Sequence, residues 1–120
     1  MSTALRSNTK KLEIDSRNLT IDRLFKTWKI EYYMLNGHDH TALDSGYSET
    51  FFISGVYSYF WGSMEGRGEW SLQNLNREIS LRGNDGQSSR TLVILKLEEK
   101  SFWYYYFDGT YKHEIHLVAA

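Results

Sequence analysis

The sequence predicts an all-β protein, an eight-stranded antiparallel up-and-down barrel preceded by a short helical turn. Three observations favour this fold class. About eight β-rich runs follow one another along the 120 residues, and a turn signal separates each run from the next. No gap between the runs is long enough for a crossover helix, so consecutive strands are expected to be antiparallel. Closure would pair the edges of strands that are rich in aromatic residues.

Composition narrows the range of functions. A chain of 120 residues fits one domain and can bury one core. Cysteine is absent, which excludes disulfides, a thiolate nucleophile and a cysteine-bound metal. The net charge of -1 gives no basic surface for nucleic acid, and no apolar run has the length of a transmembrane segment. The aromatic content of 16% and the absence of proline both suit β-strands.

Two regions are predicted, a flexible polar N-terminal segment over residues 1–18 and a barrel domain over residues 19–120. The segment carries scattered basic residues and lacks the apolar centre of a signal peptide. Two interpretations stay open. The segment is either an ordinary disordered N-terminus, or the tether of an exported lipoprotein in which Met1 replaces the lipid-modified cysteine. The second hypothesis places the protein in the periplasm or on the outer membrane, whereas the first leaves a cytoplasmic location open.

The helical turn is predicted over Leu19–Phe25, where apolar residues are spaced to cover an apolar surface and Thr20 or Asp22 can cap the turn. From Trp28 the period changes to two. Trp28, Ile30, Tyr32 and Met34 then share the inward face of the first strand. We expect Trp28 to plug the closed end of the barrel beneath the helical turn.

Seven further strands are predicted over residues 47–54, 56–63, 68–73, 78–82, 91–97, 102–107 and 111–118. The longer connections, residues 36–46, 64–67, 83–90 and 108–110, all fall at one end of such a barrel, which predicts a mouth there. Beyond the first strand, the expected core residues are Phe51, Ile53, Trp70, Leu72, Ile79, Leu81, Ile115 and Leu117. In the run 91–97 the inward face stays open, because Leu92 and Ile94 compete with Val93, Leu95 and Leu97.

Residues able to carry chemistry are few. His38-Asp39-His40, with Asp44 nearby, has the residue types of a metal site, but a histidine pair on one loop without a distant third ligand is usually solvated. His113 and His116 are three apart on a strand and therefore point to opposite faces. No nucleophile elbow or phosphate-binding loop occurs. We therefore expect no catalytic residue, no metal, no cofactor and no enzymatic activity.

Residues 19–118 resemble a small lipocalin-like, calycin-type barrel domain of bacterial exported proteins. The resemblance rests on the helical turn before Trp28, the eight-strand meander, the Asn36-Gly37 exit from the first strand and the pattern Gly66-x-Gly68-x-Trp70. Lys26 stands where the lipocalin signature has glycine, and the last strand has no arginine to stack on the tryptophan. The resemblance implies the barrel fold, whereas these two departures detach Trp28 from the family's binding function and leave it an architectural role.

Two functions follow, from different classes. In the first, the barrel binds a small apolar or amphipathic ligand at the long-loop mouth, lined by Tyr32, Met34, Tyr47, Tyr104, Tyr106 and His113. In the second, the barrel is packed solid and acts as an accessory domain that docks a partner protein through outer-face aromatics, namely Trp61, Trp103 and Tyr105. The alternative for these aromatics is that the N-terminal segment covers them or that they pair across neighbouring strands. Neither function involves nucleic acid or a transmembrane segment.

Overall fold

The computed structural model describes residues 22–44, 46–83 and 89–120. Residues 22–24 are helical. The strands and the single 3₁₀ helix that follow are β1 (Thr27–Leu35), β2 (His38–Asp39), η1 (Thr41–Asp44), β3 (Tyr47–Phe51), β4 (Val56–Trp61), β5 (Met64–Gln73), β6 (Glu78–Gly83), β7 (Arg90–Leu97), β8 (Ser101–Asp108) and β9 (Tyr111–Ala119). The predicted N-terminal segment, residues 1–18, lies outside the described residues.

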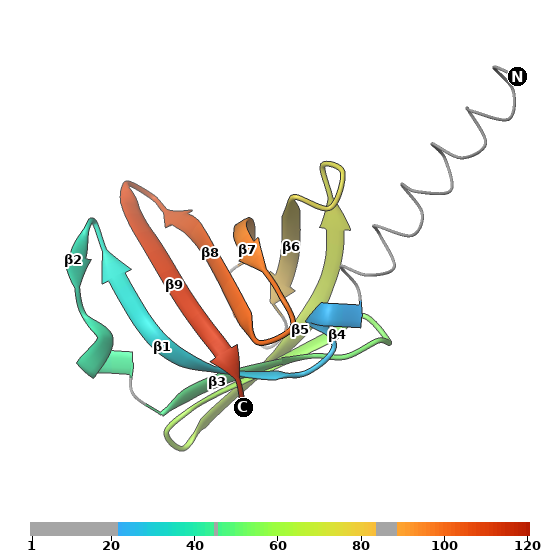
Figure 1. Ribbon diagram of the computed structural model, residues 1–120, viewed down its shortest axis with the longest axis horizontal. Coiled ribbons are helices and arrows are strands. Elements are labelled where there is room, and N and C mark those ends of the chain that lie inside the picture. Colours follow the sequence, from blue (N-terminus) through green and yellow to red (C-terminus); the bar gives the residue numbers. More distant parts are fainter. Residues whose placement is uncertain (1–21, 45, 84–88) are drawn as a thin grey trace, which may run out of the picture.

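All the described strands belong to one antiparallel sheet that closes on itself (Figure 1). The order is β1-β3-β4-β5-β6-β7-β8-β9, and β9 pairs with β1 from Trp28↔Ala119 to Leu35↔His113. The short β2 pairs only with the end of β1. Eight strands of the described chain therefore form the barrel, and the predicted fold class is confirmed.

The two ends of the barrel differ in the elements that they hold. The β1–β2 and β8–β9 hairpins and η1 lie at one end, on the left of Figure 1, and the helical residues 22–24 lie at the other. Asn36 and Gly37 both have positive φ, at 50° and 81°, as a tight hairpin turn between twisted strands requires. The end that holds this hairpin is called the mouth below.

A β-bulge at Glu31 changes which side chains of β1 face inward. Ile30 pairs with Leu117 and Tyr32 with His116, so Glu31 is an extra residue without a partner on β9. The alternation therefore shifts by one position, and Tyr33 is buried opposite Ile115. The prediction that Tyr32 and Met34 face the interior is wrong for this reason, because they lie opposite His116 and Glu114 on the outer face.

A second bulge, at Leu95 in β7, settles the face that the sequence left open. Ile94 pairs with Tyr104 and Lys96 with Trp103, so the register shifts between them. Leu92 and Ile94 face the core before the bulge and Leu97 faces it afterwards, whereas Leu95 is exposed. The set of Leu92 and Ile94 was therefore right, and of the other set only Leu97 faces the core.

The connection between β4 and β5 also differs from the prediction. The turn is formed by Gly62 and Ser63, and the residues expected to form it, 64–67, begin β5. Gly68 is needed for another reason: a Cβ there would collide with the backbone carbonyl of Arg82 on β6. The glycine therefore marks a close approach of two strands. Ile53, expected in the core, falls in the β3–β4 turn and is 80% exposed.

The closed half of the barrel is filled by apolar side chains. Trp28 is fully buried, its ring lies 5.5 Å from that of Phe102, and its Nε1 donates to the Leu24 carbonyl at 3.2 Å. This hydrogen bond fixes the helical residues over the end of the barrel. Around Trp28 lie the buried residues Leu24, Phe51, Ile79, Leu81, Leu92, Phe102 and Leu117. Because the closed half is filled, a ligand site inside the barrel formed by the described strands can lie only in the mouth half.

Candidate functional site

A pocket of about 280 Å³ opens in the mouth half of the barrel. Its lining is mainly aromatic, with one arginine and one histidine. The lining residues are Tyr33, Tyr47, Tyr57, Tyr59, Trp61, Arg90, Tyr106, His113 and Ile115. They come from six strands, because the inward positions of neighbouring strands meet only after closure of the barrel.

A buried carboxylate lies beneath the pocket. Glu49 is on β3 and is 1% exposed, between the inward positions of Tyr47 and Phe51. The hydroxyl of Tyr47 donates to Glu49 Oε2 at 2.6 Å, and that of Tyr57 donates to the same oxygen at 3.3 Å. The hydroxyl of Tyr104 lies 3.1 and 3.2 Å from the two carboxylate oxygens. These four residues, called the polar layer below, separate the apolar core from the pocket.

The electrostatics of the polar layer follow from its burial. Burial raises the pKa of the Glu49 carboxyl, although the hydrogen bonds from Tyr47 and Tyr104 and the charge of Arg90 oppose the shift. Burial also raises the pKa of Tyr47 and Tyr104, and the neighbouring carboxylate adds to this. The phenols therefore keep their protons at neutral pH and act as donors to Glu49.

One wall of the pocket is a row of stacked side chains from four neighbouring strands. Arg90 lies over the ring of Tyr106, with its guanidinium carbon 4.7 Å from the centroid. The Tyr106 ring stacks on His113 at 4.5 Å and 7°, and His113 stacks on Tyr33 at 5.8 Å and 14°. The Tyr33 hydroxyl and His113 Nδ1 are 2.7 Å apart. The row is therefore fixed by stacking and by a hydrogen bond.

The other wall comes from β3 and β4. Tyr47 and Tyr59 stack at 6.0 Å and 27°, and the rings of Tyr57 and Tyr59 are 6.1 Å apart. Trp61 continues the same inward face of β4 at the rim, with 45% of its side chain exposed. In the closed sheet order β4 is four strands from β8 in either direction. The two walls therefore face one another across the pocket.

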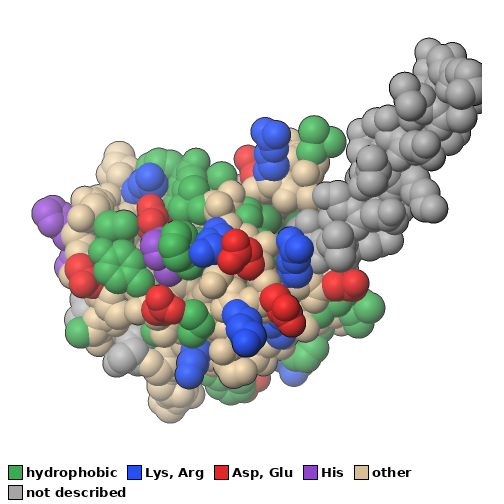
Figure 2. Space-filling view, in the orientation of Figure 1, with side chains coloured by type: hydrophobic (Ala, Val, Ile, Leu, Met, Phe, Trp, Pro, Cys, Tyr) green, Lys and Arg blue, Asp and Glu red, His purple; other side chains and the backbone are tan. Residues whose placement is uncertain are grey.

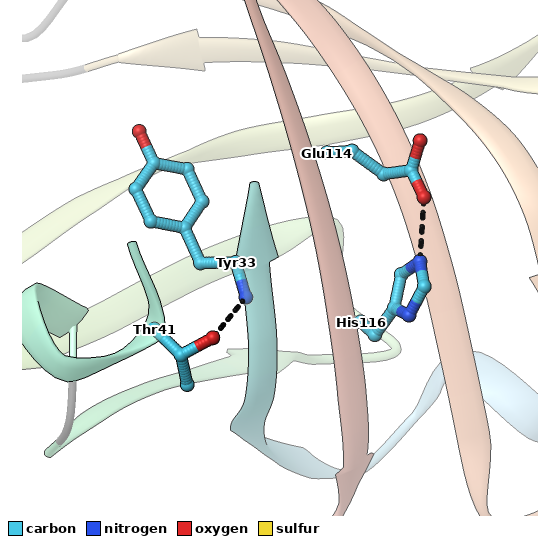
Figure 3. A network of polar contacts seen from close by, with 4 residues as sticks. All are labelled: Tyr33, Thr41, Glu114 and His116. Carbon is cyan, nitrogen blue, oxygen red and sulfur yellow. Dashed lines mark hydrogen bonds and ion pairs between the residues drawn. The ribbon is translucent and has the colours of Figure 1, made fainter. Parts of the chain in front are cut away.

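The segment after β1 holds Tyr33 in place. Thr41, the first residue of η1, accepts a hydrogen bond from the Tyr33 backbone N–H at 3.1 Å, as Figure 3 shows. Thr41 is itself held by Asp39, whose Oδ1 accepts from the Thr41 hydroxyl at 2.6 Å and from its backbone N–H at 2.9 Å. These hydrogen bonds lower the pKa of Asp39. The Asp39 carboxylate thus has a structural partner within this segment.

Only some of the residues predicted to bind a ligand lie at the pocket. Tyr47, Tyr106 and His113 line the pocket, and Tyr104 lies beneath it in the polar layer. Tyr32 and Met34 are outside, as a result of the bulge at Glu31. Trp61, assigned to outer-face docking in our alternative, is at the rim of the pocket instead, because it shares the inward alternation of Tyr57 and Tyr59.

The other two predicted docking residues lie on the outer face and are covered by their neighbours. Trp103 stacks on His116 at 3.9 Å and 6°, and Lys96 Nζ lies 4.4 Å from its ring centroid. His116 is held by Glu114 at 2.7 Å (Figure 3). Lys112 Nζ lies 4.6 Å from the ring of Tyr105. Figure 2 shows hydrophobic and charged side chains interspersed over the face that β1, β9 and β8 form.

Five aromatic or charged residues of the pocket or polar layer were not among the predicted site residues: Tyr33, Glu49, Tyr57, Tyr59 and Arg90. Glu49 had a readable signal, since it alternates with Tyr47 and Phe51 and must share their face. Arg90 opens a strand of apolar residues. Tyr33 had no such signal, because only the bulge turns it inward.

Other features of the described chain offer less to a ligand. A second hollow, of about 370 Å³, lies at the closed end between the charged residues Asp22, Arg23, Lys26, Glu98 and Glu99. It is larger than the mouth pocket but more open, and it has no aromatic wall. Among the described residues no three histidine or acidic side chains come together as metal ligands, and no helix is long and apolar enough to span a membrane.

Comparison of the chain with models of known protein families gives no match, and comparison with curated proteins gives none either. The closed eight-stranded barrel is compatible with a lipocalin-like fold. The fold and the pocket are thus the basis for any functional conclusion.

Proposed function

We propose that this protein is a non-catalytic binding protein that takes up a small amphipathic molecule in the mouth pocket. The observation that carries the proposal is a pocket with aromatic walls above a hydrogen-bonded polar layer. Ligand sites in proteins are typically concave and largely apolar, with a few well-placed polar groups that fix orientation. The mouth pocket combines these properties.

The size of the pocket limits what it takes. At about 280 Å³ it lies just below the usual range for ligand sites, roughly 300–1,000 Å³. The closed half of the barrel is filled, so a long chain has no room to extend inward. A compact ligand with a ring system fits these bounds better than a fatty acid or another extended lipid.

A binding role is favoured over catalysis by the state of the polar groups. The Glu49 oxygens already accept hydrogen bonds from three phenols, and the carboxylate is behind the pocket lining. A general base must reach the proton that it abstracts, within hydrogen-bond distance or through one water. Glu49 is best explained as the acceptor that orients the phenols.

The second function, docking of a partner protein through outer aromatics, has weaker support. Trp103 and Tyr105 are each covered by a lysine, and Trp103 also by the His116 ring. The periplasmic or outer-membrane location likewise stays a prediction, because it depends on the N-terminal segment. Cell fractionation of the natural host tests it: recovery of the protein in the cytosolic fraction alone would exclude it.

Native mass spectrometry of the protein purified from its natural host tests the binding function. We expect a bound small molecule, and we expect Trp61→Ala to weaken its retention by about 5- to 10-fold, because a wall aromatic is removed. Phe60→Ala is the matched control. Phe60 is 46% exposed, much like Trp61, but is next to it on the outward face. Equal retention by the two variants would contradict binding at the mouth.

A further inference from the structure

We propose that the ligand of the mouth pocket is a flat aromatic anion, a carboxylate on a ring system, with the anionic group paired to Arg90 and the rings held between the two walls. This inference rests on the proposed binding function and specifies the chemical class of the ligand. It follows from the charge of the lining, the place of Glu49 and the orientation of the walls.

Arg90 supplies the positive charge of the described lining. It is the first residue of β7, its side chain is half-buried, and its guanidinium carbon lies 4.7 Å from the centroid of the Tyr106 ring. No carboxylate of the described residues lies within 4.0 Å of it. An arginine fork binds a carboxylate through two parallel hydrogen bonds, and a half-buried site strengthens such a pair. The pocket therefore matches an anion better than a cation.

Glu49 does not cancel this preference. Its carboxylate is behind Tyr47 and Tyr57, whose hydroxyls donate to it from the pocket side. Burial raises the pKa of Glu49 and so favours its neutral form. A cationic ligand would thus meet the Arg90 charge directly and Glu49 only through the phenols.

The walls favour a flat ligand. Tyr106 and His113 are stacked with their rings nearly parallel, at 7°, and they face the β4 wall of Tyr59 and Trp61 across the barrel. Aromatic rings gain free energy from offset stacking or edge-to-face contact with such surfaces. Because Arg90 stands at the end of the stacked row, a ring between the walls can bring a substituent to the guanidinium.

Three naphthalene probes, measured by isothermal titration calorimetry on the full chain at neutral pH, test the inference. They are 2-naphthoic acid, its neutral amide and 2-naphthylmethylamine. We expect the acid to bind about 10-fold or more tightly than the amide, and the amine most weakly, because a charge-assisted hydrogen bond is worth about that factor. Arg90→Met should remove the preference for the acid, and Arg90→Lys should retain part of it. Arg82→Met is the control, since Arg82 is exposed on β6.

The outcomes separate the inference from the function on which it rests. If the amide binds as tightly as the acid, or the preference survives in Arg90→Met, the anion assignment is overturned while the binding function stands. If none of the three probes binds to the wild-type chain, the aromatic assignment fails, and the binding function then depends on the ligand found in the host. Because the acid and amide are compared first on the wild-type chain, the test does not depend on how well a variant folds.

Discussion

Replacement of Glu49 by leucine tests whether the polar layer is a structural unit. The substitution removes the acceptor that three phenols share. Tyr47 and Tyr57 keep each other as partners, with their hydroxyl oxygens 3.2 Å apart, and both border the pocket. Tyr104 is only 2% exposed and donates to Glu49 alone among the described residues. It is the hydroxyl that the change leaves without a partner.

The magnitude follows from that single donor. A buried donor without a partner destabilises the folded state by about 1–3 kcal/mol. Removal of the Glu49 carboxyl also removes the cost of its own desolvation, and little else is gained. We therefore expect Glu49→Leu to lower the free energy of unfolding by about 1–3 kcal/mol. For a domain of this size the melting temperature should fall by about 4 to 12 °C. Glu49→Gln retains an acceptor of the same size, and its effect should stay within about 1 kcal/mol.

Urea denaturation followed by tryptophan fluorescence measures these differences, and a double-mutant cycle assigns them. In a Tyr104→Phe background no hydroxyl is left stranded, so Glu49→Leu should cost clearly less there than in the wild type. If the cost is the same in both backgrounds, or if Glu49→Leu and Glu49→Gln are equally stable, the polar layer is not held together as described.

Three further predictions test other parts of the fold. Burial raises the pKa of Glu49 above its ordinary value of 4.5, so above that pH the folded protein keeps a proton that the unfolded chain has lost. As pH rises from 4.5 to the folded-state pKa, the unfolding free energy of the wild type should therefore fall relative to that of Glu49→Gln. If urea denaturation between about pH 4 and 8 shows the same pH dependence for both proteins, this prediction is wrong. Deletion of the bulged Glu31 should leave the alternation of β1 intact and lower the free energy of unfolding by at most about 2 kcal/mol in thermal melts. Deletion of Lys29 instead puts Trp28 out of phase and should lower it by at least about 3 kcal/mol. Equal decreases for the two deletions would refute the bulge. Gly68→Ala should cost about 1–3 kcal/mol because its Cβ meets a backbone carbonyl, while Ser71→Ala on the same strand should change the melting temperature very little.

The fold class was predictable because its signals are local. Turn residues and alternation mark each strand, and a series of short links leaves few topologies other than a meander. The bulges were not predictable, since Glu31 and Leu95 are ordinary strand residues and only the pairing with β9 and β8 reveals the extra position. The exposed Ile53 shows the same limit at a strand end, where the alternation continues in the sequence after β3 has ended.

The site was predictable only in part. Tyr47, Tyr106 and His113 were found because their strands keep a regular alternation up to the mouth. The buried carboxylate of Glu49 could have been inferred from its inward phase, but glutamate is almost never fully buried unless it is paired, and the phase alone does not reveal its partners. The β4 wall faces the stacked row on β7, β8, β9 and β1 only because the barrel closes. Closure cannot be predicted from the residues of any single strand.

The two bulges have a consequence for how the barrel can deform. They lie in β1 and β7, which are the outer neighbours of the β8–β9 hairpin. The hairpin itself is paired without interruption from Ser101↔Val118 to Asp108↔Tyr111 and holds Tyr106 and His113. A ladder with a missing pair yields at lower cost than a continuous one. The β8–β9 hairpin is therefore a rigid unit between two more deformable strand pairings, β1–β9 and β7–β8. Amide hydrogen exchange should be fastest along these two pairings when a ligand enters.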